Sequence, residues 1–404
     1  MAAAEETSSD GPKPDEYAER KPAFTVVCLG VGGGPLETNC SCYLMKPTDA
    51  TWEESTFMVE GGSFLGTLAS LLRDAGKPDS PFYDVSCDEN DDEDVRAGKF
   101  NALIRSALIS HGHLDHIFGL VLASAAQRGQ RPIYGTDDTL QTIRGMFNGR
   151  HWPPLASFDA TDPLALYHLR RLFCKQTEII APNVQVTPFS VSHGKSLIPP
   201  EEGSEKAEAV PGDSNKLFGK DVVDMPSTAF LLTNTRLERD VLFFGDVESD
   251  ETGNTMTNHN VWLSVAHLFV KKRLSTIFIE CSYTDAQPRD MLFGHFCPKL
   301  LYQDLRDFAR CVVAYRKTGN AESTDVTDEE CIGALSGLRC VIIHVKGLVI
   351  DCTKFLNRNH NLCTSYEGAP LFTQAIAAQI SDHEAEGRLG VRFHIAKRGE
   401  RLEC

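Results

Sequence analysis

Three histidines and one aspartate lie within the six residues from His111 to His116, directly after the apolar run Leu103–Ile109. Neutral imidazole nitrogens and carboxylate oxygens are the ligands that borderline divalent ions such as zinc prefer, and one strand-to-helix turn can present them to two adjacent ions. The alternative is a solvated polar turn, which explains a single histidine well but four neighbouring ligands poorly. The segment therefore predicts part of a binuclear metal site.

Three further segments repeat the pattern of an apolar strand that ends in a candidate ligand. His193 follows the apolar run ending at Val191, Asp246 follows Phe243 and Phe244, and His344 follows Val341 to Ile343. Strand ends on one edge of a sheet can bring such side chains together. The predicted ligand set is His111, His113, Asp115, His116, His193, Asp246 and His344.

The remaining sequence predicts an α/β protein with one catalytic domain over residues 23–404. Residues 1–22 are polar and predict a disordered tail, because they cannot bury enough apolar area to offset the entropy of ordering. Three polar segments are interpreted as surface insertions, at 84–99, 201–220 and 317–330. Short apolar runs between 24 and 59 predict antiparallel strands, and helices are expected near 117–127, 139–147, 260–272, 298–315 and 371–385.

Composition limits the partners. The chain has 56 acidic and 40 basic residues, a formal net charge of −16, which argues against a nucleic-acid polymer and favours a small substrate. The 13 cysteines include no C-x-x-C pair and are expected to be reduced intracellular thiols. No apolar run approaches the roughly 20 residues of a membrane span. We therefore expect a cytoplasmic protein without a membrane partner.

The order of the seven ligands resembles that of the metallo-β-lactamase superfamily, whose metal ligands lie at strand ends along one edge of a four-layer αββα sandwich. The segment from His111 to Ala125 is similar along its whole length to the signature of class II cyclic-nucleotide phosphodiesterases. Other segments resemble the same family, among them Gly33 to Asn39 and Phe293-Gly294-His295. The likeness extends from about residue 24 to residue 396.

The resemblance implies two divalent metal ions, zinc by preference, with manganese or magnesium as alternatives. His111, His113 and His193 would hold one ion, Asp115, His116 and His344 the other, and Asp246 would bridge both. It further implies hydrolysis of 3′,5′-cyclic nucleotides, cyclic AMP and also cyclic GMP, to nucleoside 5′-monophosphates, which would end a cyclic-nucleotide signal.

His295 and Glu280 are the candidates for proton transfer. The resemblance places a loop histidine beside the leaving group, and an imidazole suits an acid near neutral pH. Glu280, at the end of the predicted strand 276–279, is expected to hydrogen-bond that histidine and hold it charged. Asp115 is counted as catalytic as well as a metal ligand. The competing interpretation is that His295 caps the following helix and Glu280 pairs with a surface cation.

Two other functions stay open. The same fold serves ribonuclease Z-like and glyoxalase II-like hydrolases, although the acidic charge disfavours RNA. A non-catalytic cyclic-nucleotide sensor would be expected to have lost some of the ligands, and none is missing. The sequence does not decide between cyclic AMP and cyclic GMP, and it leaves a homodimer open.

Overall fold

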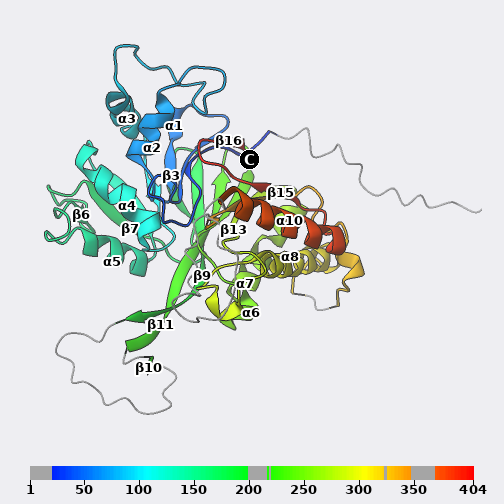
Figure 1. The fold of residues 1–404 in the computed structure, drawn as a ribbon. Coiled ribbons are helices and arrows are strands. Elements are labelled where there is room, and N and C mark those ends of the chain that lie inside the picture. Colours follow the sequence, from blue (N-terminus) through cyan, green and yellow to red (C-terminus); the bar gives the residue numbers. More distant parts are fainter. Residues whose placement is uncertain (1–20, 199–215, 218–219, 323–324, 347–368) are drawn as a thin grey trace, which may run out of the picture.

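The computed structural model describes residues 21–198, 216–217, 220–322, 325–346 and 369–404. Two β-sheets face each other, and helices cover the outer face of each (Figure 1). The predicted α/β class and the αββα arrangement are therefore confirmed. The predicted tail lies outside the described residues, apart from Lys21 and Pro22.

The first sheet carries the amino-terminal half of the chain and the carboxyl-terminal strand. Its strand order is β16-β1-β2-β3-β4-β5-β7-β6, antiparallel from β16 to β3 and parallel from β3 to β6. Because β16 pairs with β1, the last residues of the chain belong to this sheet. The strands are β1 Phe24–Gly30, β2 Cys42–Pro47, β3 Phe57–Val59, β4 Ala107–Leu108, β5 Arg131–Gly135, β6 Ala156–Ser157, β7 Tyr167–Arg171 and β16 Arg401–Glu403.

The second sheet has the order β15-β14-β13-β12-β11-β9-β8, with β10 paired to β11. Strands β12 to β15 are parallel, so their carboxyl ends meet at the same edge of the sheet. Strands β9 and β11 form a long antiparallel pair that extends beyond the body of the molecule (Figure 1). The strands are β8 Glu178–Ala181, β9 Val184–Ile198, β10 Lys216–Leu217, β11 Lys220–Asn234, β12 Arg239–Phe244, β13 Leu274–Glu280, β14 Arg339–Ile343 and β15 Arg392–Ile395.

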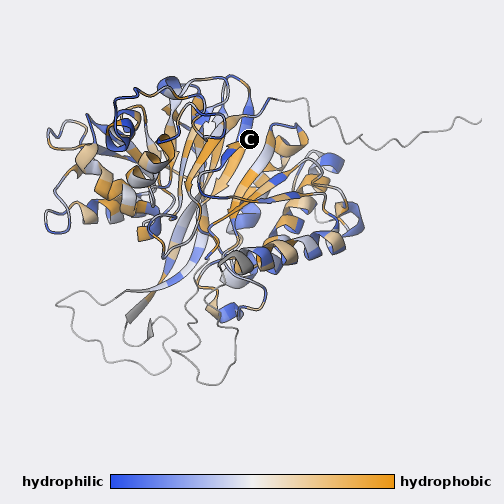
Figure 2. Ribbon diagram, turned by 45° about the horizontal axis from the view of Figure 1, so that its top comes forward, coloured by the Kyte–Doolittle hydropathy of each residue, from blue (hydrophilic) through white to orange (hydrophobic). Residues whose placement is uncertain are grey.

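The parallel strands are apolar on both faces because both faces are buried. Phe243 of β12 and Phe278 of β13 point between the sheets, where their rings stack at 5.5 Å and meet Tyr43 of the first sheet. Their neighbours Leu242 and Ile277 point to the outer helices. Figure 2 shows the hydrophobic residues concentrated along these central strands. Such continuous apolar runs are typical of strands covered on both sides.

Helices α2 to α5 pack on the first sheet, and α7, α8 and α10 pack on the second. Apolar residues spaced three or four positions apart give α8 one buried face, and Gly319 ends the helix in a left-handed conformation, with φ 75°. The helices are α1 Trp52–Ser55, α2 Leu65–Leu72, α3 Glu93–Asn101, α4 Leu114–Ala123, α5 Asp137–Met146, α6 Asp250–Gly253, α7 Thr257–Val270, α8 Pro298–Thr318 and α10 Ala369–Gly387, with 3₁₀ turns at Ser124–Ala126, Arg289–Met291 and Glu329–Cys331.

Several elements differ from the sequence-based expectation. The strand before the histidine cluster is reduced to the two residues of β4, and α4 begins at Leu114, within the cluster. The segment 84–99, expected as a loop, contains the start of α3, because Asp92 accepts from the Val95 amide and caps a helix there. Most of the insertion expected at 201–220 lies outside the described residues.

Candidate active site

All seven predicted ligands come together at one edge of the two sheets. Six of them follow a strand, whereas His193 was expected at a strand end and lies within β9, which continues to Ile198. The turn after β4 and the first turn of α4 supply the four ligands from His111 to His116. The second sheet supplies His193 within β9, Asp246 after β12 and His344 after β14. Asp246 is buried against ligands from both sheets, so the site is complete only when the sheets are packed together.

One ligand group consists of His111, His113, His193 and Asp246, whose candidate ligand atoms all lie within 4.8 Å of one another. His193 Nε2 is 3.2 Å from His113 Nδ1 and 3.7 Å from Asp246 Oδ2. His111 Nε2 is 3.8 Å from the same oxygen. Two imidazoles thus point a nitrogen at the Asp246 carboxylate, and His113 places its Nδ1 within 4.8 Å of the same group.

The second group consists of Asp115, His116, His344 and again Asp246. His344 Nε2 lies 3.1 Å from Asp246 Oδ2, 3.2 Å from Asp115 Oδ2 and 3.3 Å from His116 Nε2. His116 Nε2 is also 3.2 Å from Asp246 Oδ1. Asp246 therefore belongs to both groups, as predicted for a bridging ligand.

These donors fit divalent ions. Ligand atoms held about 2.0–2.1 Å from one tetrahedral zinc lie about 3.3 Å from each other. The separations quoted above run from 3.2 to 3.8 Å in the first group and from 3.1 to 3.3 Å in the second. His111 Nε2 is buried and has no hydrogen-bond partner among the described residues, a costly state for a polar atom unless a ligand contacts it. The site thus fits the metal ions that its residues imply.

The outward-facing nitrogens of three histidines make hydrogen bonds, and that of His116 lies beside a carboxylate without a hydrogen bond to any described residue. His193 Nδ1 donates to the Gly294 carbonyl oxygen at 2.9 Å, and His111 Nδ1 contacts the neighbouring Ser110 Oγ at 3.0 Å. His344 Nδ1 contacts Ser282 Oγ at 3.0 Å, and His116 Nδ1 lies 3.2 Å from a carboxylate oxygen of Glu60. Contacts of this kind orient an imidazole and direct its other nitrogen toward a metal.

The charges of the cluster suit metal binding. Burial lowers the pKa of His111 well below its usual value and that of His193 to about 4, so these rings are neutral and their lone pairs are free. Burial alone would raise the pKa of Asp246, but His344 and His116 hold it well below its usual range. Burial alone would lower the pKa of His116, but the charges of Asp246 and Glu60 raise it well above its usual value. The first ligand group therefore offers neutral imidazoles beside an ionised carboxylate.

Glu280 and His295 form a buried pair beside the second sheet's ligands. Glu280 Oε1 is 2.8 Å from His295 Nδ1 and accepts from the Val247 amide at 2.9 Å, while Oε2 accepts from Ser282 Oγ at 2.6 Å. Glu280 is fully buried, and α8 begins only at Pro298 with Cys297 as its N-cap. The competing interpretation, a capping histidine and a surface ion pair, is therefore wrong.

The protonation of this pair differs from the expectation that Glu280 keeps His295 charged. Burial lowers the pKa of His295 well below its usual value, and the charge of Lys346 acts in the same direction. Burial and the negative charge of Asp246 raise the pKa of Glu280 to about 7. Burial thus opposes ion pairing between the two side chains, although Glu280 Oε1 remains within 2.8 Å of His295 Nδ1.

The residues that contact the candidate ligands from behind were not predicted from the sequence. Glu60 follows β3, is 1% exposed and contacts both His116 and the Ser110 amide. Glu248 accepts from the Gly194 amide at 3.1 Å, beside His193. Glu60 also ends an apolar strand, so the pattern that found the ligands could have found it. Glu60 and His344 both have a positive φ, 58° and 57°, so two residues of the site adopt a backbone conformation that is uncommon outside glycine.

Two glycines allow the loop of His295 to contact the strand of His193. Gly294 has φ 79°, and a Cβ there would lie 2.3 Å from the His193 carbonyl oxygen. Gly194 has φ 77°, and a Cβ there would lie 2.9 Å from Gly294 Cα. Only glycine accommodates both the conformation and the approach. This contact fixes His295 relative to the first ligand group.

Comparison with known proteins identifies the family. The model of the class II cAMP phosphodiesterases matches residues 30–399. The chain belongs to this family. A 3′,5′-cyclic-nucleotide phosphodiesterase of Schizosaccharomyces pombe is 31% identical over 386 residues, covering 94% of this chain and 92% of the relative. One of Candida albicans is 24% identical over 400 residues, covering 81% and 90%.

The crystal structure of unliganded yeast PDE1 has the same fold, with a TM-score of 0.70 and 21% identity over 95% of this chain and all of that one. The predicted class II phosphodiesterase family, and with it a metal-dependent phosphodiester hydrolase, is confirmed. Among the described residues, no helix of this phosphodiesterase is long and apolar enough to cross a bilayer.

Proposed function

We propose that this chain hydrolyses 3′,5′-cyclic nucleotides, cyclic AMP and also cyclic GMP, to nucleoside 5′-monophosphates at a centre of two divalent ions. The supporting observation is the pair of ligand groups that share Asp246. One group would hold the first ion through His111, His113 and His193. The other would hold the second through Asp115, His116 and His344.

Imidazole and carboxylate donors favour zinc, and manganese or magnesium would also accept this set. When bound, such ions supply Lewis acidity toward a phosphate and acidify a water molecule near neutral pH. A cyclic phosphate then needs only alignment and a proton for the ribose 3′ oxygen that leaves. The chain's own residues meet these two requirements.

His295 would deliver the proton from Nε2 of its neutral ring, while the proton of Glu280, whose pKa is raised to about 7, passes to Nδ1. Its Nδ1 is occupied by Glu280 at 2.8 Å, which leaves Nε2 as the nitrogen available for transfer. The ring lies 4.8 Å from that of His193 and stacks at 5.2 Å on that of His344, so it is held between the two ligand groups. Glu280 acts through His295 and is a positioning residue.

The acidic chain does not prevent binding of an anionic substrate, because bound ions would dominate the local field at the phosphate. A small cyclic nucleotide, rather than a nucleic-acid polymer, fits a chain with a net charge of −16. A cytoplasmic location and a homodimer stay predictions.

The test is incubation of metal-loaded and chelated protein with cyclic AMP and cyclic GMP, with products separated by chromatography. Chelator-sensitive formation of 5′-monophosphate supports the proposal. A 3′-monophosphate would contradict the placement of His295 at the 3′ oxygen. No product from metal-loaded protein would contradict the proposed substrate and direct the search to thioesters and RNA.

A further inference from the structure

A separate group of metal-binding side chains lies on the outer helices α7 and α8. It consists of His259 on α7 and of Asp307 and Cys311 on α8, and a candidate ligand atom of each lies within 4.8 Å of the other two. None of these residues belongs to the catalytic ligand groups. An imidazole, a carboxylate and a thiolate are the three ligand types that zinc sites use, and we call this set the helix group.

The packing of α7 against α8 sets this arrangement. The two helices lie side by side (Figure 1), and the Trp262 and Phe308 rings pack at 4.9 Å between them. Asp307 and Cys311 are four positions apart and share one face of α8. Across 48 positions of sequence, His259 Nδ1 approaches Asp307 Oδ2 to 2.6 Å. The core between the helices therefore brings three ligand types to one place.

The helix group needs only a small adjustment to hold a zinc ion. Nitrogen and oxygen ligands of one tetrahedral zinc lie about 3.3 Å apart, so His259 and Asp307 must separate by about 0.7 Å from their 2.6 Å contact. Their side chains are 27% and 34% exposed, which leaves them room to move. Cys311 is 2% exposed and closes the buried side of the group. Water can reach the fourth position from the solvent side, as in zinc sites with three protein ligands.

The surroundings of the helix group favour a cation. Asp250 Oδ2 accepts from the His259 amide at 2.8 Å, and Asp304 is buried one turn before Asp307 on α8. Among the described residues, Asp250 and Asp304 form no ion pair, and Asp307 pairs only with His259. Burial raises the pKa of Asp304 well above its usual value, and the charges of Asp250 and Asp307 act in the same direction. A bound dication would offset this negative charge.

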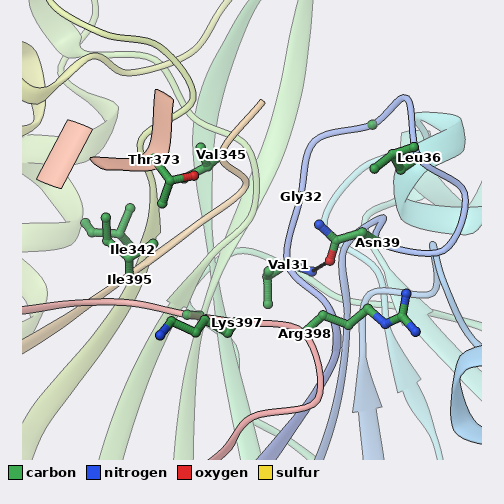
Figure 3. Close-up of a pocket in the computed structure, with 12 residues that line it drawn as sticks. Val31, Gly32, Leu36, Asn39, Ile342, Val345, Thr373, Ile395, Lys397 and Arg398 are labelled. Carbon is green, nitrogen blue, oxygen red and sulfur yellow. Dashed lines mark hydrogen bonds between the residues drawn. The ribbon is translucent and has the colours of Figure 1, made fainter. Parts of the chain in front are cut away.

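The cavity at Lys397 and Arg398 does not concentrate its polar groups in this way. It has a volume of about 310 Å³ and lies beside Val345 and Ile395, at the carboxyl ends of β14 and β15 (Figure 3). Lys397 and Arg398 extend to opposite sides of it, so the two cations do not converge on one ligand. The three side chains of the helix group do converge.

We propose that the helix group binds a zinc ion of its own, in addition to the ions of the catalytic centre. On binding, the Sγ–H bond of Cys311 breaks, the proton passes to solvent and the thiolate becomes a ligand. His259 binds through Nδ1 with its proton on Nε2, and Asp307 binds as a carboxylate. The thiolate and the imidazole favour zinc over magnesium or calcium. The ion ties α7 to α8, whatever the substrate of the catalytic centre.

The first experiment adds Co²⁺ to chelated protein and records the absorption spectrum. A cobalt–thiolate bond gives a charge-transfer band in the near ultraviolet, whereas the catalytic ligand groups contain only histidine and aspartate. We expect a band that saturates at one thiolate-bound cobalt per chain and is absent in Cys311→Ser. Asp307→Asn should weaken cobalt binding at least as much as loss of an outer contact of a metal site does, about 10–100-fold.

Two cysteine variants are the matched controls. Cys331 is buried in the same core cluster as Cys311 but lies outside the helix group, so Cys331→Ser should keep the band. Cys40→Ser should also keep it, and tests a thiol near the catalytic centre, because a Cβ on Gly62 would contact both Cys40 and the Asp115 carbonyl. Circular dichroism of each variant separates loss of binding from loss of fold. Absence of the band in the unchanged chain, or a band that survives in Cys311→Ser, would overturn the proposal.

The second experiment measures zinc by elemental analysis in Asp246→Asn, which empties the catalytic centre if its carboxylate bridges both ions. One zinc per chain should remain, and it should be lost when Cys311→Ser is added. Zinc should raise the Tm of the single variant but not that of the double variant, because an ion bound to the folded state stabilises it. Equal zinc content in the two folded variants would contradict the proposal, whether or not the chain hydrolyses cyclic nucleotides.

Discussion

The variant His295→Ala tests the proposed role of His295 as the proton donor. The side chain is 3% exposed, and Nδ1 is bound to Glu280. Every other described histidine of the site belongs to one of the two proposed ligand groups. Removing the ring therefore removes the whole contribution of the acid. General acid catalysis is worth about 10²–10⁴-fold, or about 3–5 kcal/mol of activation free energy.

We expect kcat for cyclic AMP to fall toward the larger end of that range, about 10³-fold or more, because the buried ring leaves no space for a solvent acid in the unchanged chain. The KM should change little, since the phosphate is bound by other groups. Glu280→Gln keeps the shape of the side chain but removes the charge, and should lower kcat less than His295→Ala.

The assay compares two substrates. Cyclic AMP has a poor alkoxide leaving group that needs a proton, whereas bis(4-nitrophenyl) phosphate releases a stabilised phenolate that does not. His295→Ala should therefore retain most of its activity on the second substrate. Elemental analysis should find the same metal content as in the unchanged chain.

An equal loss on both substrates, or the loss of one metal ion, would refute the assignment. His295 does lie with His193, Asp246 and Glu280 in a third group whose candidate ligand atoms are within 4.8 Å of one another. A loss of metal would show that His295 is a metal ligand in this group rather than a proton donor.

Four further changes test other parts of the structure. Asp246→Asn should lower the content of both ions by elemental analysis, because its carboxylate belongs to both groups, and loss of one ion alone would contradict the bridging role. Glu60→Gln should weaken metal affinity about 10–100-fold in a chelator competition, since it orients His116; unchanged affinity would contradict that role. Chelation of the unchanged chain should lower Tm, because ions that bind the folded state stabilise it. An ion at a free concentration of a thousand times its Kd contributes about 4 kcal/mol to the free energy of unfolding, and an unchanged Tm would count against a metal site. Phe243→Ala should cost about 3–5 kcal/mol in denaturant unfolding because its ring packs between the sheets, and a cost under 1 kcal/mol would contradict that packing.

The sequence predicted the ligands well because each is tied to a local signal. Asp246 and His344 follow the apolar strands β12 and β14, which belong to the parallel part of the sheet and therefore end at one edge. His193 also follows an apolar run, but it lies within the antiparallel strand β9, which continues to Ile198. The residues that orient them were harder to predict. Ser282 contacts His344 across 62 positions, and Glu60 contacts the Ser110 amide across 50, distances over which a single sequence contains no pairing signal.

The same limit explains the elements that the sequence did not reveal. Strand β16 has only three residues and pairs with the edge strand β1. Its conformation is therefore decided by tertiary pairing rather than by local propensity. The cavity at Lys397 joins loops that are more than 300 residues apart at Asn39 and Arg398. Its cations lie beside an apolar wall only after both sheets have formed.

The division of ligands between the sheets links metal binding to folding. The first sheet and α4 contribute the residues from His111 to His116, and the second contributes His193, Asp246 and His344. Neither sheet alone holds a complete ligand group, because each group contains members from both. Ion binding therefore favours the packed state in which the aromatic contacts between the sheets are made. Those contacts in turn hold the ligand nitrogens and oxygens at the separations that an ion requires, so the core is part of the metal site as much as the ligands are.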